Sequence, residues 1–150
     1  MLGFDVSSTL PRADSDAVWA HAVSWSGVNR ELAPIAMSHP PEFPTVASVP
    51  PDGRVHFVSV LSVFGVPFDR HHLTLQALDA PRSFHEVSSN LLMRRWEHVR
   101  TLEPIDGGVR VTDRCRLEPR AGVPARMLVA IYRRVFARRH QRLRSIFGTT

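Results

Sequence analysis

Lysine is absent from this sequence, and all nineteen basic residues are arginines. This absence excludes a lysine Schiff base, a lysine nucleophile and the lysine of a phosphate-binding P-loop. The single cysteine, Cys115, excludes an intrachain disulfide framework and a zinc site built on several cysteines. The chain has 150 residues, 43% of them hydrophobic, which is enough for one core. We therefore expect a single domain over residues 1–150.

Long hydrophobic runs are also absent. The most apolar stretch, residues 55–68, is interrupted by His56, Gly65 and Pro67. It is shorter than the roughly 20 apolar residues of a membrane-spanning helix. The first residues lack the basic segment and the apolar segment of an export signal. We therefore expect a cytoplasmic protein without integral membrane contact.

Motifs for metal binding and for nucleophilic catalysis are missing too. The eight histidines include no His-Glu-x-x-His motif, and His71 and His72 would point to opposite faces of a strand. No Gly-x-Ser-x-Gly elbow surrounds a serine. Cys115 has no neighbouring base in the sequence, so we expect a buried, unreactive thiol. We expect no metal and no cofactor.

The spacing of hydrophobic and turn residues predicts an α+β protein. Strands are grouped between helices, without the strand–helix alternation of a parallel sheet. Asp14 and its neighbours cap the first helix, Gly65 and Pro67 close the first central strand, and Gly148 ends the last helix. The predicted order is a strand at 4–10, short helices at 17–23 and 28–32, a proline-rich loop at 37–51, strands at 55–63, 73–77, 83–89, 95–103 and 109–118, and a helix at 124–147.

Several short motifs stand in a specific order along the chain. They are Val18-Trp19, GVNREL at 27–32, FHE at 84–86, RWEH at 95–98, the hairpin LEPIDGGVRVTDR at 102–114 and FARRHQRL at 136–143. With this order of elements, the sequence resembles the START-like superfamily, also called SRPBCC or helix-grip. Within it, the sequence is most similar to the branch of polyketide cyclases/dehydrases and lipid transport proteins.

The resemblance implies a helix-grip fold. In that fold a curved antiparallel sheet of six to seven strands wraps around a long C-terminal helix, and two short helices follow the first strand. A cavity between sheet and helix commonly holds an apolar ligand in such proteins. The superfamily includes carriers, cyclases and stress proteins and has no universal catalytic residue. No catalytic role can therefore be transferred to this chain.

Titratable residues share one face of the predicted hairpin at 95–118. Side chains alternate across a strand, so Trp96, His98 and Arg100 lie on the same face as Asp113. If Glu103 pairs with Gly108, then His98 stands opposite Asp113; a slip of two residues places Arg100 there instead. The face is the same in both registers. Charged groups on an inward face must be paired, so we expect a satisfied network.

Three interpretations of this network remain open. In the first, His98, Arg100 and Asp113 anchor the polar end of a hydrophobic or amphipathic, lipid- or polyketide-like molecule. In the second, the protein is a cyclase or dehydratase, with His98 as general acid or base, Asp113 orienting it and Arg100 holding a developing enolate. In the third, the cluster is structural and the protein is a non-catalytic interaction module.

The pocket walls are expected from inward-facing residues of the strands and the last helix. Besides Trp96, the expected ligand contacts are Phe57, Leu73, Leu75, Phe84, Glu86 and Tyr132; Ser59, Leu61, Leu128 and Val135 complete the wall. Most of these positions equally suit a plain core, but Glu86 is costly to bury without a partner. The loop at 37–51 is interpreted as a candidate lid because long loops in compact domains are often functional.

Arginines crowd the predicted C-terminal helix. They are Arg126, Arg133, Arg134, Arg138, Arg139, Arg142 and Arg144. Most lie opposite the apolar stripe, which predicts an arginine-rich outer face. Such a face suits an acidic protein partner or is simply solvated. The aromatics and modules of nucleic-acid binding are lacking, so we expect no nucleic acid. A homodimer is compatible with the sequence.

Overall fold

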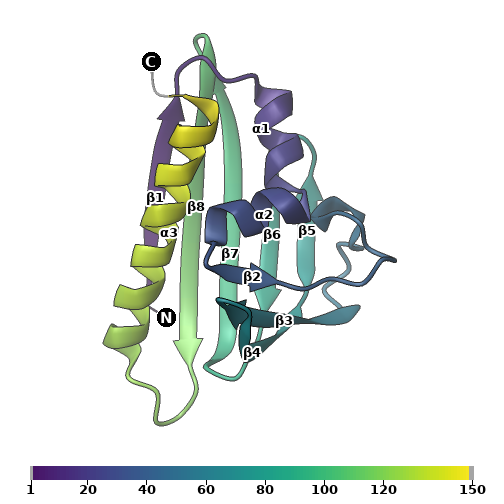
Figure 1. The fold of residues 1–150 in the computed structure, drawn as a ribbon, viewed down its shortest axis with the longest axis vertical. Helices are drawn as coiled ribbons and strands as arrows, with labels where there is room; N and C mark the ends of the chain where they lie inside the picture. Colours follow the sequence, from purple (N-terminus) through teal and green to yellow (C-terminus); the bar gives the residue numbers. More distant parts are fainter. Residues whose placement is uncertain (1, 149–150) are drawn as a thin grey trace.

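The computed structural model of the chain describes residues 2–148 (Figure 1). Its elements are β1 (Leu2–Leu10), α1 (Ser15–Ala22), α2 (Trp25–Leu32), β2 (Ile35–Met37), the 3₁₀ helix η1 (Val46–Ser48), β3 (Phe57–Val63), β4 (Val66–Leu73), β5 (Leu75–Asp79), β6 (Ser83–Ser88), β7 (Met93–Ile105), β8 (Gly108–Pro119) and α3 (Ala125–Phe147). The expected α+β, helix-grip fold class is confirmed.

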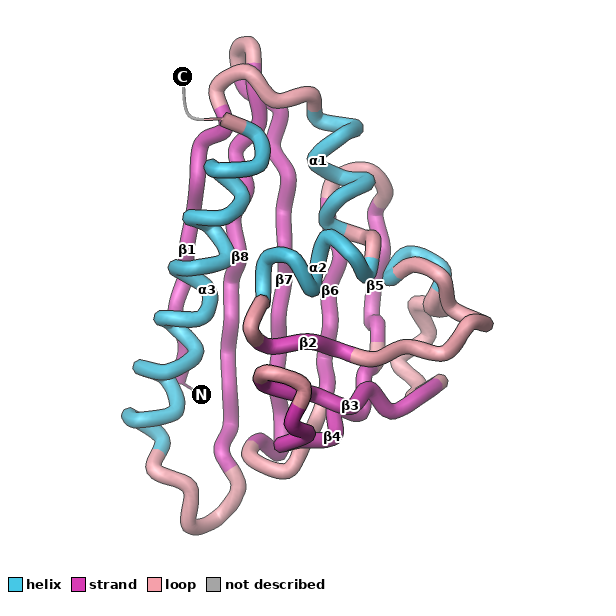
Figure 2. The backbone as a smooth tube through the Cα atoms, in the orientation of Figure 1, coloured by secondary structure: helices cyan, strands magenta, loops and turns pink. Residues whose placement is uncertain are grey.

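The strands form two antiparallel sheets. The larger sheet has five strands in the order β1-β8-β7-β6-β5, and the smaller one has three in the order β2-β3-β4. The yellow helix α3 runs along β1 and β8, whereas α1, α2 and the three-stranded sheet lie over the other half of the large sheet (Figure 1). Figure 2 shows the long, curved strands β7 and β8 between these two groups. The expected single sheet of six to seven strands is thus divided into two.

The strand β4 was not expected, because Gly65 and Pro67 suggested the end of a strand. Instead, Phe64 and Gly65 form a two-residue turn, both with positive φ, and β4 returns antiparallel to β3. Proline is tolerated in β4 because that strand is at the edge of its sheet. The register also shifts next to the Ser62–Pro67 pair.

The β7–β8 hairpin fixes which titratable side chains meet. Ile105 pairs with Gly108, so the turn contains only Asp106 and Gly107, and the positive φ of Gly107 (75°) suits such a turn. The pairing of Glu103 with Gly108 is therefore wrong by two residues. Arg100 stands opposite Asp113. The predicted face is correct, since every second residue from Trp96 to Leu102 is buried.

Side-chain caps define the two short helices. The Asp14 carboxylate accepts a hydrogen bond from the amide of Ala17 (3.2 Å) and starts α1. The Ser24 hydroxyl accepts one from the amide of Gly27 (2.9 Å), so α2 begins at Trp25, three residues earlier than expected. The extra residues begin with Trp25, which is buried and, together with Val28, packs α2 onto the core.

Among residues 2–148, no helix is both long enough and apolar enough to cross a membrane.

Candidate functional site

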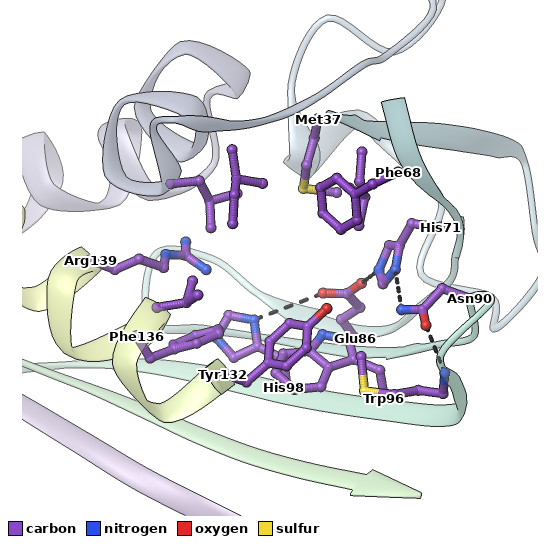
Figure 3. A pocket seen from close by; sticks show the side chains of 15 residues that line it. Met37, Phe68, His71, Glu86, Asn90, Trp96, His98, Tyr132, Phe136 and Arg139 are labelled. Atoms are coloured by element: carbon purple, nitrogen blue, oxygen red, sulfur yellow. Dashed lines mark hydrogen bonds and ion pairs between the residues drawn. The ribbon is translucent and has the colours of Figure 1, made fainter. Parts of the chain in front are cut away.

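A cavity of about 80 Å³ lies between α3, the three-stranded sheet and the floor formed by β6 and β7 (Figure 3). Its lining comes from five strands, the helices α2 and α3, and the segment that connects β6 to β7. The lining residues are Leu32, Ile35, Met37, Leu61, Phe68, His71, Glu86, Asn90, Met93, Trp96, His98, Tyr132, Val135, Phe136 and Arg139. Most of the wall is apolar, and a few polar groups are gathered at the floor and on α3.

A chain of hydrogen bonds fixes the polar floor. The Asn90 carbonyl oxygen accepts from the amides of Leu92 (3.1 Å) and Met93 (2.8 Å), so its amino group faces the Nδ1 atom of His71 at 3.2 Å. His71 Nδ1 is therefore an acceptor, and His71 Nε2–H donates to Glu86 Oε2 (2.5 Å). Backbone amides thereby determine the tautomer of His71.

Glu86 uses its two oxygens unequally. Oε2 accepts from both His71 and the hydroxyl of Ser88 (2.6 Å). Nδ1 of His98 lies 3.8 Å from Oε1, which is too long for a hydrogen bond. Burial by itself would raise the pKa of Glu86, but the imidazoles of His71 and His98 lower it below its usual range. Glu86 is thus an anion with one oxygen available toward the cavity.

Behind the floor, Arg100 joins two buried carboxylates. Its guanidinium donates to Glu31 (3.0 and 2.8 Å) and to Asp113 (2.8 and 2.8 Å). All three side chains are at most 1% exposed. Burial would raise the pKa values of both carboxyls, but Arg100 foremost holds them well below their usual range. Because such carboxylates need a cation close by, this is the structural core of the network.

Histidines and a second arginine complete the network. Asp113 also accepts from Nε2 of His98 and Nε2 of His140, each at 2.7 Å. Glu31 accepts from His21 (2.8 Å) and from Nε of Arg139 (3.0 Å). Through Glu31, the network connects α2 to β7 and α3.

The structure separates the predicted site residues into three groups. Trp96, His98, Glu86 and Tyr132 line the cavity. Arg100 and Asp113 are fully buried behind it and are not among its lining residues. The remaining four, Phe57, Leu73, Leu75 and Phe84, pack together with α2 in a separate hydrophobic cluster.

Other expected wall residues are divided in the same way. Leu61 and Val135 line the cavity. Ser59 is buried and donates to the carbonyl of Ser38 (2.7 Å), and Leu128 packs in the hydrophobic cluster around Trp96. Of the predicted polar face, Trp96 and His98 therefore reach the cavity, whereas Arg100 and Asp113 lie behind it.

Several residues of the site were not predicted. Glu31 is 69 residues away from Arg100 in sequence, and Asn90 acts from a loop. Arg139 was counted among the arginines of the outer face of the last helix, yet it is buried, and His140 beside it is buried too. The sequence signal for Glu31 is the amphipathic pattern of α2. Glu31 follows Val28 by three residues and therefore lies on the buried face of that helix.

The arginine-rich face is smaller than expected. Arg126, Arg133, Arg134 and Arg138 are exposed. The other three make contacts: Arg139 with Glu31, Arg144 with the Ser8 hydroxyl (2.8 Å), and Arg142 with the carbonyls of Glu31 and Ala33. These contacts attach α3 to β1 and α2.

The loop at 37–51 lies mainly against α2. Trp25 stacks on His39 with ring centroids 5.0 Å apart, and its indole donates to the carbonyl of Phe43 (2.8 Å). Val46 and Val49 are buried in the same cluster. Within this loop, Met37 lines the cavity. The candidate lid thus contacts the site at its first residue.

Within residues 2–148, no group of three or more His, Cys, Asp and Glu side chains is arranged to hold a metal ion. His71 is buried and its neighbour His72 is exposed, in line with their opposite faces on β4. Cys115 is buried, and burial raises the pKa of its thiol.

Comparison with family profiles identifies a family. The family profile described as "Domain of unknown function (DUF8410)" matches residues 8–147. No curated protein sequence matches the chain significantly.

Solved structures share the fold over nearly the whole chain. A START superfamily protein from Mycobacterium smegmatis has a TM-score of 0.66 at 9% identity, covering 97% of this chain and 95% of that protein. Ara h 8.0201 has a TM-score of 0.59 at 15% identity, covering 96% and 98%. DynU16, from the dynemicin biosynthetic locus, has a TM-score of 0.62 at 16% identity; the match covers 94% of this chain and 46% of DynU16. The chain thus spans about half the length of DynU16. The fold is START-like, as the sequence motifs implied.

Proposed function

The chain belongs to the DUF8410 family, and on that premise and its START-like fold we propose that it binds a small, mainly apolar molecule, lipid- or polyketide-like, in the cavity beside α3. The observation that carries this proposal is the composition of the cavity wall. Aromatic and aliphatic side chains surround a small set of convergent polar groups, which is the usual composition of a small-molecule site.

The cavity size limits what binds without rearrangement. A water-sized sphere needs about 10–15 Å³, so the cavity has room for roughly six of them. This volume is about half the roughly 150 Å³ of an apolar cavity that holds benzene, so a short chain fits it without rearrangement. A larger ligand requires the wall formed by Met37, Leu61 and Phe68 to move outward. All three belong to the three-stranded sheet.

Native mass spectrometry of the purified protein, followed by organic extraction, tests the proposal directly. A bound organic molecule of defined mass is the expected result. Val135→Phe fills the cavity from α3 and should abolish binding. Ala137→Phe places the same ring on the exposed side of α3 and should leave binding intact. A protein that is empty and also fails to bind fatty acids and ring-sized ketones contradicts the proposal.

Acid–base catalysis is the second candidate, and one observation favours it. His98 lines the cavity while its Nε2–H is held by Asp113, so Nδ1 is the ring atom left for a ligand. The test is deuterium uptake by the methyl group of acetophenone in D₂O, followed by NMR. A catalytic His98 makes uptake faster than in buffer, and His98→Gln removes that gain. Uptake equal to that in buffer rejects the proposed catalysis. We do not assign enolate binding to Arg100, because it is buried outside the cavity lining and donates four hydrogen bonds to Glu31 and Asp113.

A further inference from the structure

Two polar groups in the cavity are incompletely used by the protein. In the part of the chain that the structure describes, Glu86 Oε1 lacks a donor within hydrogen-bond distance. Arg139 donates through Nε to Glu31, but within residues 2–148 its two Nη amino groups have no acceptor. Its side chain is only 6% exposed, and its guanidinium lies on the cavity wall (Figure 3). Among the described residues, the one fully buried side-chain N or O atom without a hydrogen-bond partner is Asp69 Oδ2, so the unpaired atoms of Glu86 and Arg139 are still reached from open space. Both can therefore pair with a molecule that enters the cavity.

The hydroxyl of Tyr132 is a third such group. It also lacks a protein partner within the described residues, and it projects among the lining side chains (Figure 3). Burial raises the pKa of Tyr132 to about 12, so the phenol keeps its proton at neutral pH. The cavity therefore offers donors from α3, at Arg139 and Tyr132, and an acceptor from β6, at Glu86.

The charged side chains around the cavity determine whether an ionised or a neutral ligand is favoured. The Arg139 charge is already paired with Glu31, at 3.0 Å. On the floor, Glu86 is an anion, and the amino group of Asn90 faces Nδ1 of His71. The cavity wall therefore has no excess positive charge for a carboxylate ligand. An ammonium ligand would share the cavity with the Arg139 guanidinium and would lose its hydration.

We infer that the ligand is an uncharged molecule that donates a hydrogen bond from a hydroxyl or N–H group to Glu86 Oε1 and accepts one at a carbonyl-type oxygen from Arg139 or Tyr132. This inference rests on the proposed ligand binding and specifies its chemistry. The remaining wall, with Trp96 and Phe136 among its rings, contacts an apolar or aromatic body.

Ring-sized probes test this chemistry by calorimetry. 3-Hydroxyacetophenone has a donor, an acceptor and no charge. 3-Methylacetophenone lacks the donor, 3-hydroxybenzoate adds a negative charge, and 3-hydroxybenzylamine adds a positive one. Because a hydrogen bond to a charged acceptor is worth about tenfold in affinity or more, the hydroxyl probe should bind at least about tenfold tighter than the methyl probe. Both charged probes should bind more weakly than 3-hydroxyacetophenone.

Glu86→Gln changes the polarity at this point with little change in shape. The carboxamide oxygen can still accept from His71 and Ser88, which turns the amino group toward the cavity in place of Oε1. The hydroxyl probe should then lose most of its advantage over the methyl probe. Glu97→Gln is the matched control, because His85 and Glu97 form the same kind of His–Glu pair between β6 and β7 (3.0 Å), outside the cavity. Tyr132→Phe should weaken both ketones alike.

The outcomes distinguish a failure of the inference about Glu86 from a failure of the proposed ligand binding. Equal binding of the hydroxyl and methyl probes supports a ligand cavity but overturns the inference about Glu86. Tighter binding of either charged probe also overturns it. If no probe binds and the purified protein contains no molecule, both the inference and the proposed function fail. The comparison of probes in the unmodified protein holds even if Glu86→Gln does not fold.

Discussion

The buried Arg100 gives the sharpest prediction about stability. In Arg100→Met the side chain keeps a comparable apolar length but loses its four hydrogen bonds to Glu31 and Asp113. Both carboxylates are 0% exposed, so water cannot replace the guanidinium without a change of structure. Removing one partner of a buried ion pair typically costs about 3–5 kcal/mol.

Two carboxylates lose their cation in this variant, but the cost should not double, because each keeps other hydrogen-bond donors. Glu31 keeps hydrogen bonds from His21 and Arg139, and Asp113 keeps those from two other histidines. We therefore expect a loss of about 3–5 kcal/mol in the free energy of unfolding near pH 8. For a domain of this size, such a loss lowers Tm by roughly 6–20 °C.

The pH dependence identifies the cause. In the unmodified protein the folded-state pKa values of Glu31 and Asp113 are lowered, so the stability that they provide is present above about pH 4 and is lost as the pH falls further. Without Arg100, burial raises both pKa values toward and above their unfolded values. Protonation then removes the cost of the unpaired buried charges. The loss in the free energy of unfolding, relative to the unmodified protein, should therefore shrink between about pH 8 and pH 5.

Urea unfolding followed by circular dichroism at both pH values measures this deficit. Arg110→Met is the control on the same hairpin, because Arg110 is 48% exposed and lies 3.8 Å from the exposed Glu103. It should change stability by less than about 0.5 kcal/mol. A deficit for Arg100→Met below about 1 kcal/mol, or one that grows on acidification, would refute the reasoning.

Three further predictions concern single side chains. Tyr132 is the only tyrosine in the chain, so the ultraviolet absorbance of tyrosinate should stay low past pH 10 and rise near pH 12; a midpoint near 10 in the folded protein contradicts its burial. Cys115, whose pKa is raised by burial, should react with iodoacetamide only after denaturation, and rapid labelling of the native protein, detected by mass spectrometry, counts against this. Phe64→Asn replaces an 84% exposed aromatic at a φ of 48° by the residue that favours an Asn-Gly turn, so it should stabilise by roughly 0.5 kcal/mol or more in thermal unfolding; a lower Tm rejects this account of the turn.

Local patterns predicted the faces of the strands well but not their register. Alternation alone placed His98, Arg100 and Asp113 on one buried face, because that property has a period of two. The register depends on the length of the turn. The two-residue turn at Asp106-Gly107 and the expected four-residue turn fit the same alternation, so the pattern could not distinguish them.

Contacts between residues far apart in the chain could not be predicted from the sequence. Glu31 reads as one polar position on a short helix, and nothing near it indicates that its carboxylate meets Arg100 and Arg139. Long-range packing also explains why only some of the expected wall residues line the cavity. Phe84 and Glu86 are both on β6, yet only Glu86 reaches the cavity, because α2 covers the part of the sheet around Phe84. That coverage depends on tertiary packing.

The two walls of the cavity differ in how firmly they are attached. The α3 wall is held to α2 and β7 by buried ion pairs through Glu31, whereas the opposite wall is a separate three-stranded sheet with its own hydrogen-bond ladder. Opening that smaller sheet breaks the pair between His71 and Glu86 but no ion pair to Glu31, so we expect its amides to exchange with deuterium before those of β7 and β8. The molecule therefore opens on one side first, and a ligand too large for the closed cavity would enter at a rate set by that sheet and not by the helix.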